Sequence, residues 1–337
     1  MATPTDDSTT AIRSDDKITD TEDDEEDFEA RVGWRYTVGQ IKRDPTALLG
    51  LGIILVVTTM ATVSFVDGVV LPWLGFEKYV IAKSVWMSPL AEPANTPQFL
   101  PPVGLENTAG EGTWAHPLGT DNRGRDILLR IIYGSRIAIQ VAVIATAVGM
   151  VGGTLVGAVA GYYGGVVDDV LMRLVETLYA IPFLVLVLAF MAALGRDLTF
   201  AMIGVGIVSI PEFARLIRSR VVSVREEEYI DAARAAGVRD RNIIRRHVIP
   251  NSFAPVLVQG TLRIGSAILI VAGLSFLGFG VQPPTPSWGA MLSQSRNSMI
   301  ASPFYSIWPG LAILITVVGF NLFGDGLRDA LDPRLDN

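Results

Sequence analysis

The stretch EYIDAARAAGVRDRNIIRRHVIPN, residues 228–251, is a strongly charged segment between two apolar runs that are long enough to cross a membrane. Good helix formers fill 226–236, and Gly237 is placed to end that helix in a left-handed conformation. Asp240 is predicted to cap a second short helix, 241–248, which Pro250 stops. An ordered two-helix unit in a loop favours docking of a soluble partner.

One face of the first predicted helix is unusually small. Ala232, Ala233, Ala236 and Gly237 follow i, i+1, i+4, i+5 spacing and therefore share a face with almost no side-chain bulk. Another protein surface can approach such a backbone closely. The alternative is an amphipathic hairpin on the lipid surface, because the nine arginines between 215 and 246 would suit anionic headgroups.

Outside this loop the chain is strongly apolar. Half of its 337 residues are hydrophobic, and apolar runs of membrane-spanning length recur six times. The sequence therefore predicts an all-α membrane protein with six transmembrane helices. Pro182 in the third run and Pro211 near the end of the fourth are expected to be tolerated as kinks. The predicted spans are 47–66, 138–160, 174–194, 198–217, 256–280 and 307–326.

The second span carries a glycine every fourth residue, at Gly149, Gly153, Gly157 and Gly161. Such a stripe of small residues lets two helix backbones pack closely. Packing within the chain is favoured over a dimer contact.

The distribution of basic residues predicts the orientation. With both termini inside, the inner segments hold 18 Lys and Arg residues and the outer segments hold 8. This bias predicts an N-in/C-in topology, with the loop 215–255 in the cytoplasm.

Composition also predicts how the chain is divided. Residues 1–29 carry 12 acidic and two basic residues, so 1–30 is predicted to be a disordered acidic cytoplasmic tail. An interfacial segment, a six-helix transmembrane domain and a cytoplasmic C-tail follow at 31–46, 47–326 and 327–337. The domain contains an extracytoplasmic loop, 67–136, in which Thr120 or Asp121 is expected to cap the helix that leads into the second span.

Motifs for catalysis are absent from the sequence. It has no GxxxxGKS phosphate loop, no nucleophile elbow, no HExxH and no cysteine, and the predicted topology puts His116 and His247 on opposite sides. We therefore predict no catalytic, cofactor-binding or metal-binding residue. Charges in the spans are expected near their ends, at Glu176, Glu212 and Asp325, with Arg263 near the start of span five. That placement disfavours self-powered secondary transport, which needs such groups near the bilayer centre.

The loop also resembles a known signature. DAARAAG (231–237), then nine residues and HVIP (247–250), is similar to the EAA motif of ABC importer permeases, with Asp231, His247 and Ile249 replacing Glu, Ile and Leu. Further stretches resemble the dipeptide/oligopeptide/nickel branch of that family, and specifically the "C" member of its permease pair. They are HPLGTDNRGRD (116–126), GLSFLGFGVQPPTPSWGAML (273–292) and GLRDALDPRL (326–335).

The resemblance implies a type I ABC importer permease fold in a multi-pass protein of the cell (inner or plasma) membrane, surrounded by lipids and without a nucleic-acid partner. It implies a heterodimer with a second permease subunit, two cytoplasmic ATPase subunits that bind ATP and Mg²⁺, and an extracytoplasmic solute-binding protein. The helix 226–240 would be the coupling helix, seated in a groove of an ATPase subunit. Its expected contact residues are Glu228, Tyr229, Asp231, Ala232, Ala233, Ala236, Gly237 and Asp240.

The expected function is passage of di- or oligopeptides across the membrane, driven by the partner ATPases, with no enzymatic activity in this chain. The same role for nickel or another small solute is an alternative. A stand-alone secondary transporter or channel and a structural membrane anchor are further alternatives. No individual residue of the substrate pathway is predicted.

Overall fold

The computed structural model describes residues 34–90, 96–195 and 197–331. The predicted acidic tail, 1–30, lies outside the described residues, as does most of the predicted C-tail. The helices at the N-terminal side are α2 (Trp34–Arg43), α3 (Pro45–Phe65), a π-helical turn (Val66–Val70), α4 (Leu71–Trp73) and α5 (Val80–Val85). A short hairpin follows, formed by β1 (Glu106–Asn107) and β2 (Gly110–Glu111).

The remaining elements form the helical bundle and its loops. They are α6 (Ile127–Tyr163), α7 (Gly165–Ala180), α8 (Phe183–Leu194), α9 (Leu198–Val224), α10 (Glu228–Ala235), α11 (Asp240–Ile243), a π-helical turn (Ile244–Val248), α12 (Ile249–Ser252), α13 (Ala254–Phe276), α14 (Trp288–Ser295), a 3-10 turn (Arg296–Ser298) and α15 (Phe304–Leu331).

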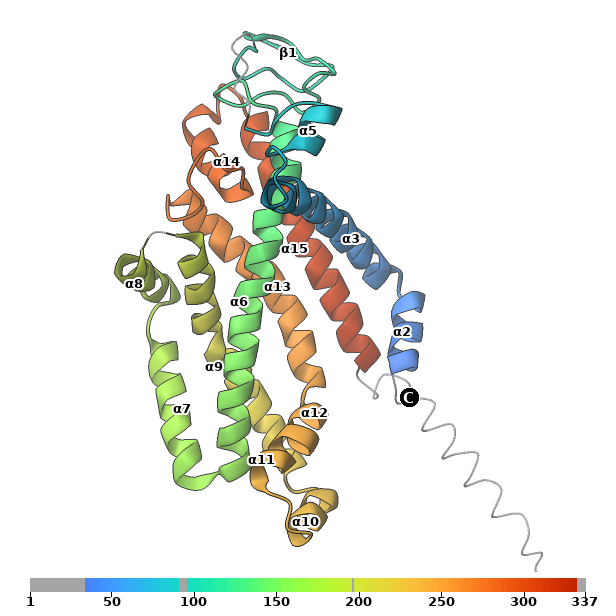
Figure 1. The fold of residues 1–337 in the computed structure, drawn as a ribbon, viewed down its shortest axis with the longest axis vertical. Coiled ribbons are helices and arrows are strands. Elements are labelled where there is room, and N and C mark those ends of the chain that lie inside the picture. Colours follow the sequence, from blue (N-terminus) through green and yellow to red (C-terminus); the bar gives the residue numbers. More distant parts are fainter. Residues whose placement is uncertain (1–33, 91–95, 196, 332–337) are drawn as a thin grey trace, which may run out of the picture.

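Among the described residues, five helices are long and apolar enough to cross a membrane. The third predicted span is not one helix, because α7 and α8 are bent by 91° relative to each other. Ile181, which precedes Pro182, is extended, as expected for a residue before proline, so the helix breaks where only a kink was predicted. Figure 1 shows that α7 starts at the end of the bundle that carries α10, and that α8 lies about halfway up the molecule, beside the start of α9. With the bent pair counted as one span, the described residues contain six candidate crossings.

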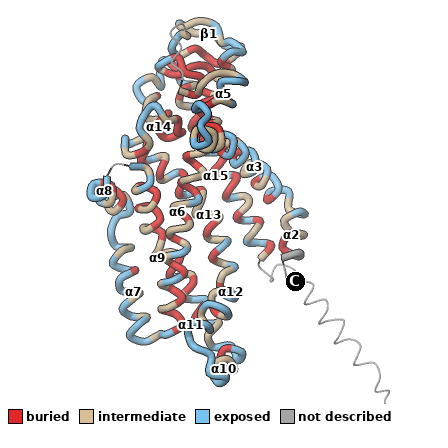
Figure 2. The backbone as a smooth tube through the Cα atoms, in the orientation of Figure 1, coloured by how far each residue is buried: buried red, intermediate tan, exposed pale blue. Residues whose placement is uncertain are grey.

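Close packing of α6 on α9 forms the centre of the bundle. A side-chain carbon added at Gly153 would lie 2.8 Å from the Ala214 backbone nitrogen, and one added at Gly157 would lie 2.2 Å from the Ala214 carbonyl oxygen. Gly149 and Gly161 meet α9 in the same way. The predicted packing of the glycine stripe within the chain is confirmed. Figure 2 shows that this centre is buried, whereas α7, α8 and α10 are largely exposed.

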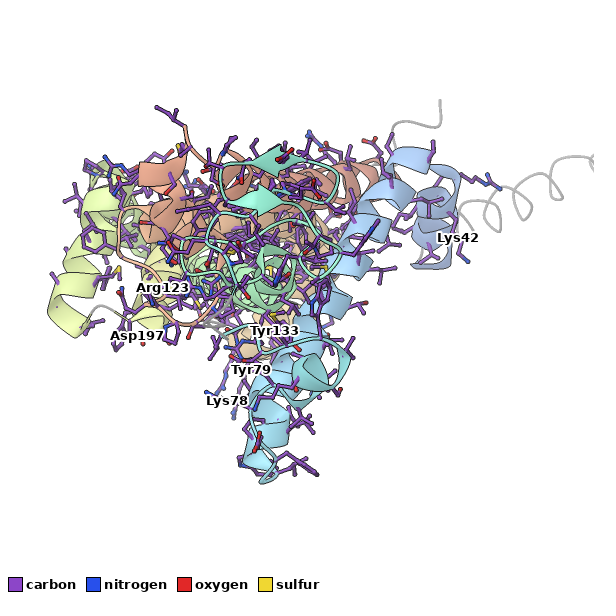
Figure 3. The ribbon with its side chains drawn as sticks, turned by 90° about the horizontal axis from the view of Figure 1, so that it is seen from above. Lys42, Lys78, Tyr79, Arg123, Tyr133 and Asp197 are labelled. Carbon is purple, nitrogen blue, oxygen red and sulfur yellow. The ribbon has the colours of Figure 1, made fainter. Side chains whose placement is uncertain are left out.

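The extracytoplasmic end is a compact cap held by buried carboxylates. Asp67 accepts hydrogen bonds from the backbone N–H groups of Ile81 (2.8 Å) and Ala82 (2.9 Å) and from the Tyr133 hydroxyl (2.5 Å). It thereby ties α5 to the start of α6. Seen from above in Figure 3, Tyr79 and Tyr133 lie near this junction, and their rings meet edge to face with centroids 5.4 Å apart.

The N-cap of α6 differs from the prediction. Asp126 accepts from the Leu129 N–H (2.7 Å) and also contacts His116 Nδ1 (3.0 Å), so neither Thr120 nor Asp121 caps this helix. Asp121 is used in its own turn, where it accepts from the N–H groups of Arg123 and Arg125 and from Arg125 Nε. Because these bonds occupy the Asp121 carboxylate, it does not cap α6.

The structure brings together two charges that were predicted near the ends of two different spans. Glu212 lies near the middle of α9 and Arg263 near the middle of α13. Arg263 Nη1 lies 3.2 Å from Glu212 Oε2, and Arg263 Nε donates to Ser209 Oγ (3.1 Å). Helix α9 continues past the predicted span 198–217 to Val224, and α13 starts at Ala254 rather than at 256. The placement of these charges relative to the bilayer centre stays a prediction.

Viewed along the bundle, the molecule is elongated. Figure 3 shows Asp197, which follows the bent pair, and Lys42, on α2, at opposite edges. Asp44 separates α2 from α3 and caps α3 by accepting a hydrogen bond from the Thr46 N–H (2.8 Å). A further hydrogen bond from the Thr46 hydroxyl lowers the pKa of Asp44 below its usual value.

Candidate coupling surface

Helix α10 projects from the end of the bundle that the charge bias places in the cytoplasm (Figure 1). It starts after the extended Glu227 and ends in a left-handed Gly237 with φ +74°. The Gly237 N–H donates to the Arg234 carbonyl (2.9 Å) and the Val238 N–H to the Ala233 carbonyl (3.1 Å). This pair of bonds is a Schellman motif, which confirms the predicted left-handed helix end.

A single apolar side chain anchors α10 to the bundle. Ile230 is completely buried, in one cluster with Tyr162 of α6, Ile217 of α9 and Val256 of α13. Ile243 and Val248, from the segments after α10, are fully buried in the same cluster. The loop is therefore packed onto the cytoplasmic ends of three membrane helices and does not hang free.

Polar contacts to the end of α6 add to this anchor. The Tyr162 hydroxyl donates to Asp240 Oδ1 (2.8 Å), and Arg234 lies over the Tyr162 ring, 5.2 Å from its centroid. The hydrogen bond with Tyr162 raises the pKa of the Arg234 guanidinium above its usual value. Arg225, directly after α9, also binds the end of α6 by donating hydrogen bonds to the Gly161 and Tyr162 carbonyls. Tyr162 thus links both parts of the loop.

The second helix of the loop differs from the prediction in two ways. Asp240 is its first residue and does not cap it, because the carboxylate is bound by Tyr162 and Arg239 occupies the cap position. Pro250 does not stop the helix, which passes through the π-helical turn into α12 and ends at Ser252. Pro250 is the second residue of α12 and follows directly after the π-helical turn.

The predicted contact residues divide between two faces of the loop. Ala233 is partly buried, because it packs against the cluster that contains Ile230. The space around Gly237 is open, since an added side-chain carbon would meet no atom within 4 Å. The exposed members of the predicted set are Glu228, Tyr229, Asp231, Ala232, Ala236, Gly237 and Asp240.

The exposed side chains are held in place rather than free. Asp231 pairs with Arg234 one turn later (3.0 Å), and the Tyr229 hydroxyl accepts a hydrogen bond from Asn251 Nδ2 (3.1 Å). The surface presented to a partner is a short helix with small residues, one ordered tyrosine and acidic groups. Such a surface fits a shallow groove that offers donors to carboxylates.

Sequence reasoning missed the residues that make the surface rigid. Ile230, Tyr162 and Arg234 were not predicted to matter. A signal for Ile230 was present, because it is the single large aliphatic residue between Glu226 and Gly237 and stands three residues before Ala233. No sequence signal pairs Tyr162 with a loop nearly eighty residues later. Among the described residues, no group of three His, Cys, Asp or Glu side chains could hold a metal ion.

Comparison with known proteins places this arrangement in context. Residues 153–337 match the family model described as "Binding-protein-dependent transport system inner membrane component". A dipeptide transport system permease protein from Alkalihalophilus pseudofirmus is 39% identical over 311 residues, which cover 92% of this chain and 93% of that protein.

Other comparisons agree. A glutathione transport system permease protein from Pectobacterium atrosepticum is 41% identical and covers 78% of this chain and 92% of its own length. Among solved structures, an inward-facing form of the MetNI methionine ABC transporter is similar, with a TM-score of 0.51 and 15% identity. The similarity covers 61% of this chain and 98% of that chain, so the two share a fold.

Proposed function

The chain belongs to the family of binding-protein-dependent transport system inner membrane components and is a permease subunit of an ABC importer, and from that premise we propose that it passes peptide-like substrates and couples through α10 to an ATPase subunit. It is a multi-pass membrane protein with the type I importer permease fold. Its relatives are transport subunits, so the proposal assigns ATP hydrolysis, with its Mg²⁺, to partner chains.

The names of the relatives support a peptide-like substrate. Relatives that cover most of this chain are named for dipeptide or glutathione transport, and both solutes carry amide groups and free carboxylates. The same role for nickel or another small solute stays the alternative. Final selection of the solute is assigned to the binding protein.

Burial of Ile230 is the observation that carries the coupling proposal. A push on α10 would reach α6, α9 and α13 through one buried cluster, which Ile230 forms together with residues of all three helices. ATP binding in the partner would draw the two coupling helices of the assembly together, and the bundle would switch between two packings as a rigid body. The free energy comes from contacts that differ between the two states.

The proposed assembly is a heterodimer of this chain with a second permease, two ATPase subunits and a solute-binding protein. The exposed surface of α7 and α8 supports contact with a second subunit, because both helices carry exposed large apolar side chains such as Leu174 and Phe183 at the side of the bundle. The domain limits at 31–46 and 327–337 stay predictions.

Copurification tests the assembly. The chain is tagged, native membranes are solubilised gently at high salt, and the recovered proteins are identified. Recovery of a second six-span permease and one or two ATPases, with a binding protein, is expected. Recovery of the chain alone, even with ATP trapped, would contradict the coupling role of α10.

Uptake by the reconstituted complex tests the substrate. Peptide accumulation that requires ATP hydrolysis is the expected result, and accumulation driven by a proton or sodium gradient without ATP would support a secondary transporter instead. The Glu212–Arg263 pair makes that alternative worth testing, since charges within spans often serve ion-coupled transport.

A further inference from the structure

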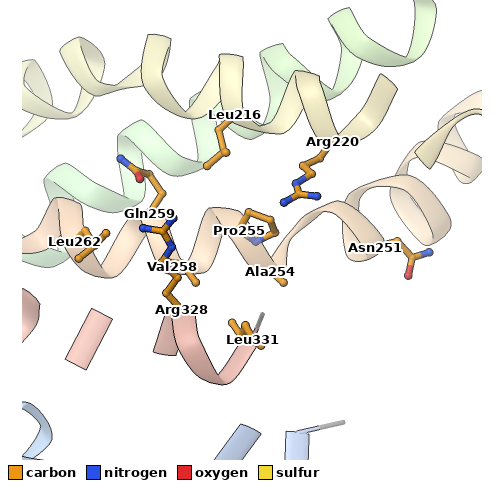
Figure 4. A pocket seen from close by; sticks show the side chains of 10 residues that line it. All are labelled: Leu216, Arg220, Asn251, Ala254, Pro255, Val258, Gln259, Leu262, Arg328 and Leu331. Carbon is orange, nitrogen blue, oxygen red and sulfur yellow. The ribbon is translucent and has the colours of Figure 1, made fainter. Parts of the chain in front are cut away.

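A cavity of about 810 Å³ opens between the cytoplasmic ends of α9, α13 and α15 (Figure 4). Its volume lies in the range of small-molecule sites, roughly 300–1,000 Å³. The floor is apolar, and two amides stand at its edges. The lining residues are Leu216, Arg220, Asn251, Ala254, Pro255, Val258, Gln259, Leu262, Arg328 and Leu331.

The charge of the lining is entirely positive. Arg220 from α9 and Arg328 from α15 point from opposite sides toward the first turns of α13 (Figure 4). Neither arginine forms an ion pair with any of the residues that the structure describes, whereas Arg218, two residues before Arg220, is paired with Asp168. Two unpaired cations around a cavity attract an anionic group.

A charged pair lies one helical turn deeper than this lining. Glu212 precedes Leu216 by four residues on α9, and Arg263 follows Gln259 by four residues on α13, so each shares a face with a lining residue. The side chain of Glu212 is 31% exposed although it lies within an apolar span. A partly exposed charge there needs water beside it, which indicates that the polar path continues inward from the cavity.

We propose that this cavity is the cytoplasmic part of the substrate pathway, and that Arg220 and Arg328 bind the carboxylate of a passing peptide. The inference rests on the proposed peptide import and names the site in this chain that it uses. Gln259 offers a donor and an acceptor for peptide amides, and the floor of Leu216 and Val258 accepts apolar side chains. Asn251 offers its carbonyl oxygen, because its Nδ2 already donates to Tyr229 and to the His247 carbonyl. The Glu212–Arg263 pair marks the inner limit of the site.

Labelling of an engineered cysteine tests access and charge. The chain has no cysteine, so Val258→Cys, with Ala254→Cys as a second position, gives a unique thiol in the cavity. In the full complex with its partner chains, an anionic methanethiosulfonate reagent is expected to react about tenfold faster than a cationic one, corresponding to about 1.4 kcal/mol of electrostatic preference. Arg220→Gln should remove most of that preference.

Val166→Cys is the matched control. It is exposed at the same end of the bundle but does not line the cavity, so the two reagents should react with it at similar rates. Alanyl-alanine or glutathione, added during ATP-driven turnover, should slow labelling at position 258 and leave position 166 unchanged. Equal rates of the two reagents at 258 and 254, with no protection by either peptide, would overturn the proposal.

Transport by arginine variants tests function. Arg220→Gln and Arg328→Gln should each lower peptide uptake about tenfold, in line with loss of one charge-assisted hydrogen bond. Arg220→Lys should recover part of the rate because it keeps the charge. Arg296→Gln, at the extracytoplasmic end, is the control and should transport normally.

The lipid composition of the membrane distinguishes binding of a peptide in the cavity from binding of a lipid headgroup. In nanodiscs of phosphatidylcholine alone, peptide protection at position 258 should persist. Protection that requires phosphatidylglycerol and ignores peptide would assign the cavity to a lipid headgroup and overturn the proposal. If the wild type takes up peptide and the arginine variants take it up at the same rate, this site is rejected but the importer function is kept. Absence of any ATP-driven peptide uptake would reject both.

Discussion

At the extracytoplasmic end of the bundle, charged side chains such as Asp121 and Arg125 are buried and paired, whereas those of α10 at the cytoplasmic end are exposed. Asp121 accepts hydrogen bonds from two backbone N–H groups and from Arg125 Nε. On α10, only Ile230 is fully buried.

The two ends therefore have different roles: the extracytoplasmic end fixes the shape of the chain, and α10 at the cytoplasmic end offers a contact surface. Buried charges at one end need their partners, so they fix the cap in a single arrangement. At the other end an apolar anchor holds the helix and leaves its polar groups for another protein. A change in the cap should therefore act on folding, while a change on α10 should act on coupling.

The largest expected effect follows from breaking the cap. Asp121→Ala removes the carboxylate beside Arg125 and Arg130 and leaves two buried guanidinium groups without it. Loss of one partner of a buried pair costs about 3–5 kcal/mol. Thermal unfolding of the purified chain in detergent should show this loss, and Glu228→Ala on exposed α10 should leave the midpoint unchanged. Equal midpoints for the two variants would contradict the comparison.

A smaller effect is expected at the end of α10. Gly237→Val places a β-branched residue at φ +74°, which costs about 1–2 kcal/mol locally. The helix end should rearrange, and substrate-stimulated ATPase activity of the complex should fall while the chain remains folded. Gly237→Asn, which tolerates this conformation, is the matched control. Normal stimulated activity in the valine variant would refute the prediction.

A larger side chain on the exposed face of α10 tests the contact with the ATPase subunit separately from the stability of the chain. Ala232→Leu keeps helix propensity at an exposed position, so its stability should match the wild type. Close seating of the partner should be blocked, and recovery of the ATPase in copurification should fall about tenfold, or about 1.4 kcal/mol. Val166→Leu, exposed elsewhere at this end, should recover it normally. Undiminished recovery with Ala232→Leu would show that the partner binds another face.

The smallest effect is expected from removing the acidic tail. Deletion of residues 2–28 takes away a segment whose composition predicts no packed structure. Peptide uptake, corrected for the amount of protein in the membrane, should be unchanged. A loss of uptake at normal abundance would give the tail a role at the cytoplasmic end.

Sequence alone predicted the features that depend on local chemistry. The left-handed Gly237 and the glycine stripe of α6 follow from one residue type at one spacing, and both are confirmed. Features that depend on distant neighbours were missed. The break at Pro182 was predicted as a kink, because the sequence cannot show whether neighbouring helices hold the two halves in line.

The candidate site divides in the same way. Seven of the eight contact residues named from the sequence are exposed, whereas Ala233 is partly buried because it packs against the cluster that Ile230 forms with residues of three distant helices. Asp240 was predicted as a cap by its residue type, yet Tyr162 from α6 takes its carboxylate. Local preference was overridden in each case by a contact with a membrane helix.

The bend between α7 and α8 has a consequence for how the chain enters the bilayer. Helix α7 has 16 residues and is therefore about 24 Å long, shorter than the roughly 30 Å hydrocarbon layer. Its exposed Arg173 and Glu176 add to the cost of leaving water. The membrane insertion machinery meets here a segment that lipid alone stabilises poorly. Biogenesis of this span is thus expected to depend on the arrival of a neighbouring subunit, and a chain made in excess becomes a substrate for membrane quality control.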